Sequence, residues 1–121
     1  MNSTLAPPLK RSYDIDGSRI AVWADFVKAI NALLPDAHWQ GNSLDALDDI
    51  LSGGYGTPDR FVVIWKDSEA SRRALGYEAT ARFYERLPDF EALYRVGTLK
   101  TLFETVVEIL QGHDTIELRL E

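Results

Sequence analysis

The sequence predicts an α/β domain with a small parallel sheet packed with helices. Segments with strand and helix patterns alternate along the 121 residues in the order strand, helix, helix, strand, several helices, strand, and such an order favours parallel pairing. The run Phe61 to Trp65 is continuously apolar, which is typical of a strand covered on both faces. The length and a hydrophobic content of 45% suit one domain with its own core.

The first half of the chain predicts a strand and two helices. Tyr13 to Ile15 is a short strand, followed by an Asp16-Gly17 turn and, over 19–22, the approach to a helix. Apolar residues then recur at helical spacing, at Trp23, Phe26, Val27, Ile30, Leu33 and Leu34. Pro35 ends this helix, and Ala37 to Ser43 is expected to be a loop.

A second helix is predicted from Leu44 to about Ser52. Either Asn42 or Ser43 can cap its first turn, because both side chains can accept a bond from a backbone N–H. Gly53-Gly54 then ends the helix.

The second half predicts helices and a closing strand. We expect helices over 67–75, 77–87 and 88–94, and a further helix from Thr98 to Gln111 with an apolar stripe. Thr115 to Leu120 alternates apolar and charged residues, as a strand with one wetter face does. Residues 1–12 are expected to be a flexible tail, and 13–121 the folded domain.

Composition narrows the function. The chain has 13 basic and 19 acidic residues, a net charge of −6, which argues against nucleic-acid binding through phosphate contacts and suits a basic partner. It has no cysteine and two histidines, His38 and His113, which leaves little material for thiol or histidine chemistry. No apolar run approaches the ~20 residues of a membrane span, and a cytoplasmic protein is the simplest expectation.

The most informative segment is acidic. Ala29 to Asp59 holds five aspartates and no lysine or arginine. At about 100° per residue, the predicted second helix has one aliphatic arc, made of Leu44, Leu47, Ile50 and Leu51. Its opposite arc is polar and holds Asp45, Asp48, Asp49 and Ser52. The helix is therefore expected to dock by leucines and to present carboxylates.

Three explanations of these carboxylates stay open at this point. Acids near a helix N-terminus interact well with its dipole, which accounts better for Asp45 than for Asp48 or Asp49. Unpaired carboxylates can instead be kept for a cationic partner. Mg²⁺ or Ca²⁺ also prefers carboxylates, although the spacing matches no loop motif for these ions.

The segment Trp39-Gln40-Gly41-Asn42-Ser43-Leu44-Asp45-Ala46-Leu47-Asp48-Asp49-Ile50-Leu51 resembles the barstar family, inhibitors of secreted ribonucleases of the barnase type. The resemblance covers roughly Tyr13 to Leu75 and Leu99 to Leu120. Between these parts, 76–97 is expected to be a helical insertion before the last helix. The resemblance implies a three-stranded parallel sheet and an inhibitor without catalysis, cofactor or metal.

The resemblance also implies a partner and a site. The partner would be a basic extracellular ribonuclease or nuclease toxin, with no direct binding of nucleic acid or membrane, and the chain would be an intracellular inhibitor or immunity protein. Asp45 and Asp49 would meet the enzyme's phosphate-binding groups, Trp39 would pack on its catalytic histidine, and Glu108 would be a peripheral contact. The full set of partner-binding residues implied is Trp39, Gly41, Asn42, Leu44, Asp45, Asp48, Asp49, Ser52, Gly53 and Glu108.

Two other functions remain as alternatives. The same fold could serve a regulatory or adaptor protein with a non-nuclease partner, or, less well supported, a small carboxylate-dependent metalloenzyme. Trp39 falls in no apolar pattern, so its exposure for binding and its packing under the second helix are both open.

Overall fold

The computed structural model describes residues 11–54, 57, 60–85 and 100–121. In chain order the elements are β1 (Arg11–Asp16), η1 (Gly17–Arg19), α2 (Trp23–Leu33), α3 (Leu44–Leu51), β2 (Phe61–Lys66), α4 (Ser68–Ala74), α5 (Tyr77–Tyr84), α7 (Leu102–Gln111) and β3 (Ile116–Leu120). No helix in these ranges is long and apolar enough to cross a membrane.

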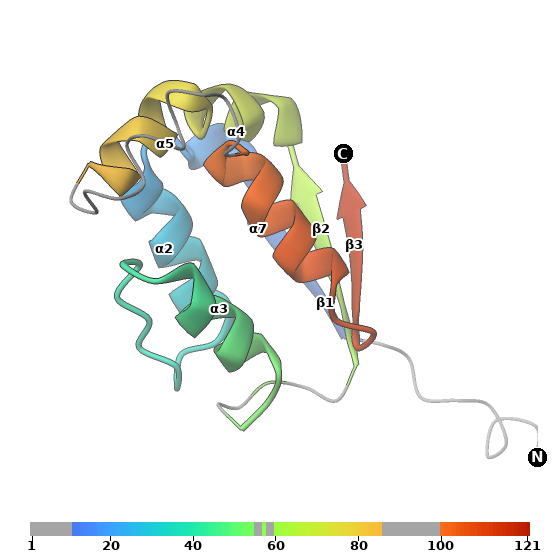
Figure 1. Cartoon of the computed structure of the whole chain (residues 1–121). Coiled ribbons are helices and arrows are strands. Elements are labelled where there is room, and N and C mark those ends of the chain that lie inside the picture. The colour runs from blue at the N-terminus through green and yellow to red at the C-terminus, as the bar shows by residue number, and fades with distance from the viewer. Residues whose placement is uncertain (1–10, 55–56, 58–59, 86–99) are drawn as a thin grey trace, which may run out of the picture.

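The three strands form one sheet in the order β1-β2-β3, and both pairs are parallel. Residues Arg11 to Asp16 pair with Phe61 to Lys66, and Phe61 to Trp65 pairs with Ile116 to Leu120. The predicted α/β class is confirmed, with the sheet on one side of the molecule and α2, α3 and α7 together on the other (Figure 1).

The core lies between the sheet and the helices. Phe61, Val63 and Trp65 of β2 belong to the main buried cluster, and the Trp65 ring stacks on Phe26 of α2 with centroids 5.4 Å apart. Val62, although buried, lies outside that cluster. The second face of β2 is largely shielded from solvent too, because Val62 is buried and Ile64 is half-buried, as the continuous apolar run predicts.

Two elements, β1 and the last helix, begin at other residues than the sequence predicts. β1 begins at Arg11, so Arg11 and Ser12 belong to the sheet rather than to the expected tail. The last helix begins at Leu102 rather than Thr98, because Thr101 is its N-cap: the Thr101 hydroxyl accepts from the Glu104 backbone N–H, and the Glu104 carboxylate accepts from the Thr101 N–H. This reciprocal capping box fixes the start of the helix.

The expected insertion is partly described. Helix α5 occupies Tyr77–Tyr84, in agreement with the first of the two helices predicted there. The helix expected over 88–94 lies outside the described residues.

Candidate partner-binding site

Helix α3 is anchored by one face. The Ser43 hydroxyl accepts from the Ala46 backbone N–H at 3.1 Å, so Ser43 rather than Asn42 is the cap. Leu47, Ile50 and Leu51 are buried. Asp45, Asp48 and Asp49 are exposed, and we call these three residues the acidic ridge.

Only one carboxylate of the ridge has a side-chain partner of opposite polarity within the described structure. Asp48 Oδ1 lies 2.7 Å from Nε2 of His113, which follows α7 and whose side chain is 14% exposed. Asp45 and Asp49 form no ion pair with any residue in the described ranges. Two carboxylates one helical turn apart therefore remain available, although such a like-charged pair costs a few tenths of a kcal/mol.

Tyr84 of α5 lies beside one end of the ridge. Partial burial and, to a smaller extent, the Asp45 carboxylate raise the pKa of the Tyr84 phenol. Both effects disfavour a phenolate. The insertion helix and the start of α3 thus share one local environment.

The loop before α3 is held in place by hydrogen bonds to α2 and by the burial of Trp39. Trp39 is 4% exposed and belongs to the core, so the structure selects packing over exposure for this ring. The Asn31 side chain of α2 clamps the Trp39 backbone, donating from Nδ2 to its carbonyl at 2.8 Å and accepting from its N–H at 2.7 Å. The Trp39 indole donates to the Ser43 carbonyl at 3.1 Å. The implied packing of Trp39 on a partner ring does not fit this buried placement.

A second tryptophan fixes the same loop. The Trp23 indole donates to the Gly41 carbonyl at 2.7 Å, and its ring packs edge-on against Trp39 with centroids 5.7 Å apart. Gly41 has φ +79°, and a Cβ there would overlap the Val27 side chain. Gly41 is therefore buried against α2, and its lack of a side chain serves the fold of the loop.

The remaining expected residues lie as follows. Asn42 and Ser52 are exposed, while Leu44 and Gly53 are half-buried. Glu108 is exposed on α7, which packs against α3, and it forms an ion pair with Lys100. The acidic ridge, Asn42 and Ser52 therefore lie together on α3 and the residues that flank it, whereas Glu108 comes from a neighbouring helix with its charge already paired.

The described residues include no group of three His, Asp or Glu side chains that could hold a metal ion. Carboxylates of the ridge therefore have no third ligand close by within these ranges.

Fold and site together describe a small parallel α/β domain that presents an acidic helix and a buttressed loop. The family model described as Barstar (barnase inhibitor) matches residues 11–114, a range that contains every element of the site. The chain belongs to the barstar family, whose members are ribonuclease inhibitors rather than enzymes. No curated protein matches the sequence.

Sequence reasoning missed several residues that shape the site. Asn31 and Trp23 support the loop, His113 pairs with Asp48, and Tyr84 lies beside Asp45. The sequence could have pointed to Asn31, because a polar amide that lies among the apolar positions of a helix needs hydrogen-bond partners. The other three contacts join distant parts of the chain, and no local pattern reports them.

Proposed function

We propose that the chain inhibits a basic ribonuclease, a secreted enzyme or nuclease toxin, within the cytoplasm of the cell that makes it. Helix α3 and the loop 37–43 would cover the enzyme's active site, and carboxylates would occupy the positions of RNA phosphates. The observation that carries the proposal is that Asp45 and Asp49 are exposed on an anchored helix, without an ion-pair partner among the described residues.

The energetics favour a cationic partner. Asp45 and Asp49 repel each other weakly in the free protein, and a basic active site would replace this repulsion with charge-assisted hydrogen bonds, which are about twice as strong as neutral ones. Because Ser43, Leu47 and Leu51 already fix the helix, little conformational entropy is lost when the carboxylates bind.

The test is inhibition of RNA cleavage by barnase and by a panel of other basic ribonucleases. For an enzyme that the chain inhibits, Asp49→Ala should weaken inhibition most and Asp45→Ala next, each on the order of 10- to 100-fold, since hydrogen bonds to charged groups contribute about 1.5–3 kcal/mol. Glu108→Ala should have little effect, because the resemblance implies only a peripheral contact there.

Glu69→Ala is the matched control, because it removes an exposed carboxylate from α4, whose exposed pair with Arg72 contributes little. Added salt should slow association more than it hastens dissociation, as expected when long-range attraction speeds encounter. An unchanged inhibition constant for Asp49→Ala contradicts the contact scheme. Failure of the wild-type chain to inhibit any basic ribonuclease of the panel contradicts the proposed function and favours a non-nuclease partner.

A further inference from the structure

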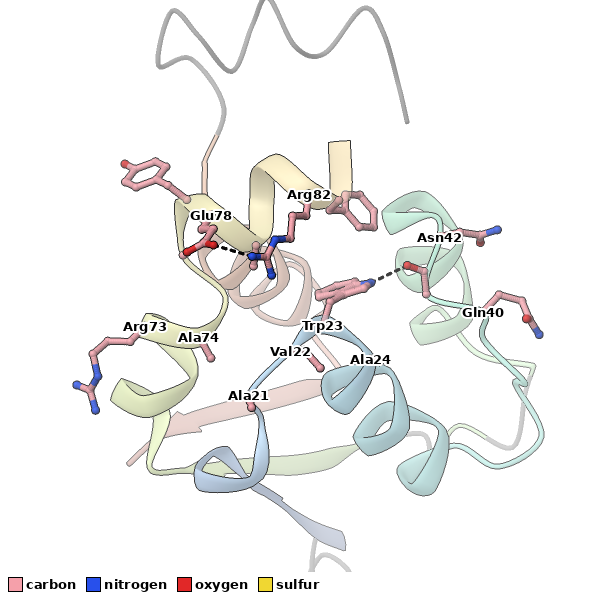
Figure 2. Close-up of a pocket in the computed structure, with 15 residues that line it drawn as sticks. Ala21, Val22, Trp23, Ala24, Gln40, Asn42, Arg73, Ala74, Glu78 and Arg82 are labelled. Atoms are coloured by element: carbon pink, nitrogen blue, oxygen red, sulfur yellow. Dashed lines mark hydrogen bonds and ion pairs between the residues drawn. The ribbon is translucent and has the colours of Figure 1, made fainter. Parts of the chain in front are cut away.

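A groove lies next to the acidic ridge. It has a volume of about 860 Å³ and is bounded by the start of α2, residues 40–42 and helix α5 (Figure 2). We propose that this groove receives an apolar side chain from a surface loop of the same basic ribonuclease that covers the ridge. The inference rests on the proposed function and adds a second, uncharged anchor to it.

The accessible lining of the groove is mixed, with somewhat more apolar than polar surface. Val22 is 50% and Tyr77 64% exposed, and they are two of the three large exposed hydrophobic residues in the described ranges. Trp23 and Phe83 contribute ring surface to the same lining, and their rings meet edge-on with centroids 5.3 Å apart. The groove therefore gathers exposed apolar side chains in one concavity instead of scattering them singly over the surface.

The charged residues of the lining do not call for a charged occupant. The Arg82 guanidinium is paired with the Glu78 carboxylate at 2.6 Å, and Arg73 points away from the groove (Figure 2). An aromatic or branched aliphatic side chain therefore fits the accessible lining better than a phosphate or a carboxylate does.

The groove and the ridge are continuous. Gln40, Gly41 and Asn42 line the groove, and the next residue, Ser43, is the cap of α3. On the opposite side, Phe83 lines the groove and is followed by Tyr84, whose phenol lies near Asp45. A protein bound over Asp45 therefore reaches the mouth of the groove.

The ridge alone is too small for a stable complex. Specific interfaces involve about 20–30 residues on each side, and α3 with its caps supplies only a few exposed ones. Toward α7 the neighbouring carboxylates already have side-chain partners, His113 for Asp48 and Lys100 for Glu108. Toward α5 lies the groove with its exposed Val22 and Tyr77 and the rings of Trp23 and Phe83, and interface centres are enriched in aromatic contacts. The partner is therefore expected to extend toward α5.

Val22 offers a sharp test because it is a poor N-cap. It precedes α2 and makes no side-chain cap bond, while the Asp25 carboxylate accepts from the Ala21 and Val22 backbone N–H groups at 3.0 and 3.1 Å. A serine at this position would complete a capping box with Asp25. Val22→Ser should therefore keep or raise the stability of the free protein while it removes apolar surface from the groove.

The experiment compares the affinities of full-length variants for a basic ribonuclease that the wild-type chain inhibits. Val22→Ser should weaken binding roughly tenfold, as expected for the loss of a buried valine contact. Ala24→Trp, which fills the groove mouth from the exposed side of α2, should weaken binding at least as much. Leu120→Ser and Ala32→Trp are the controls, because they replace an apolar residue by serine and an alanine by tryptophan at exposed positions outside the groove.

The outcomes separate the two proposals. Weaker binding by Val22→Ser and Ala24→Trp, with unchanged controls and unfolding midpoints no lower than that of the wild type, supports the groove as a contact. If both variants bind with wild-type affinity while Asp49→Ala binds more weakly, the ribonuclease does not contact the groove. The proposed function is then unaffected. If Val22→Ser is less stable than the wild type but binds equally well, the proposed contact is also refuted. The side chains of the groove then stabilise the fold of this chain instead. If the wild-type chain binds no ribonuclease, both proposals fail together.

Discussion

Replacement of Asn31 by alanine tests whether the loop before α3 is held by α2. The Asn31 side chain makes two hydrogen bonds to the backbone of Trp39, at 2.7 and 2.8 Å, and the Trp39 residue is 4% exposed. Asn31→Ala removes both partners at once. The backbone N–H and carbonyl of a buried residue are then left without them.

The magnitude follows from these contacts. Two hydrogen bonds contribute about 1 kcal/mol each, and leaving their buried partners unsatisfied adds about 1 kcal/mol more. Alanine is a better helix former than asparagine by roughly 0.6 kcal/mol. We therefore expect Asn31→Ala to lower the free energy of unfolding by about 2–2.5 kcal/mol.

Urea denaturation measures this change. With a slope of about 1.5 kcal/mol per molar urea, the midpoint should fall by roughly 1.5 M. Lys28→Ala, on the exposed side of the same helix, should stay within about 0.5 kcal/mol of wild type. If Asn31→Ala is no less stable than Lys28→Ala, the clamp does not hold the loop, and the account of why Trp39 is buried is wrong.

Two further predictions concern the fold around the site. Gly41→Ala should lower the melting temperature by about 5 °C or more, because φ is +79° and the new Cβ overlaps Val27. Gly54→Ala, at φ +90° but with nothing within 4 Å of its Cβ, should have a smaller effect in the same thermal scan, and equal effects would refute the role of the Val27 contact. Hydrogen bonds from the backbone N–H and hydroxyl of Thr101 hold the pKa of Glu104 below its usual range, so this carboxylate stabilises the fold above about pH 4 and the contribution is lost as the pH falls further. Glu104→Gln should flatten the acid side of the stability–pH curve measured by urea titration, and an unchanged acid side would contradict this linkage.

The elements with strong local signals were predicted well. The leucine spacing of α3 and the Ser43 hydroxyl define a helix whose bounds agree with the structure within a residue. The predicted start of the last helix, Thr98, lies too early because Leu99 continues the apolar spacing of that helix. The stronger signal was the Thr101-to-Glu104 capping box, where two side-chain bonds outweigh one more apolar position.

The site was harder to predict because its geometry depends on contacts distant in sequence. The sequence could show that Ala29 to Asp59 lacks basic residues, but it could not show that His113 comes to lie beside Asp48. Whether Trp39 is exposed or buried could not be predicted for the same reason. Its burial depends on Asn31 and Trp23, and loop residues carry no periodic pattern that reports such contacts.

The shortness of α3 limits how the acidic surface could be copied. Helices of fewer than about 12–15 residues are marginal in water, and α3 has eight, with two carboxylates that repel each other. A synthetic peptide spanning 43–52 would therefore be unstructured and would lose about 1–2 kcal/mol per residue on ordering. A mimetic of this surface would need a cross-link or a scaffold in place of the core that Leu47, Ile50 and Leu51 supply.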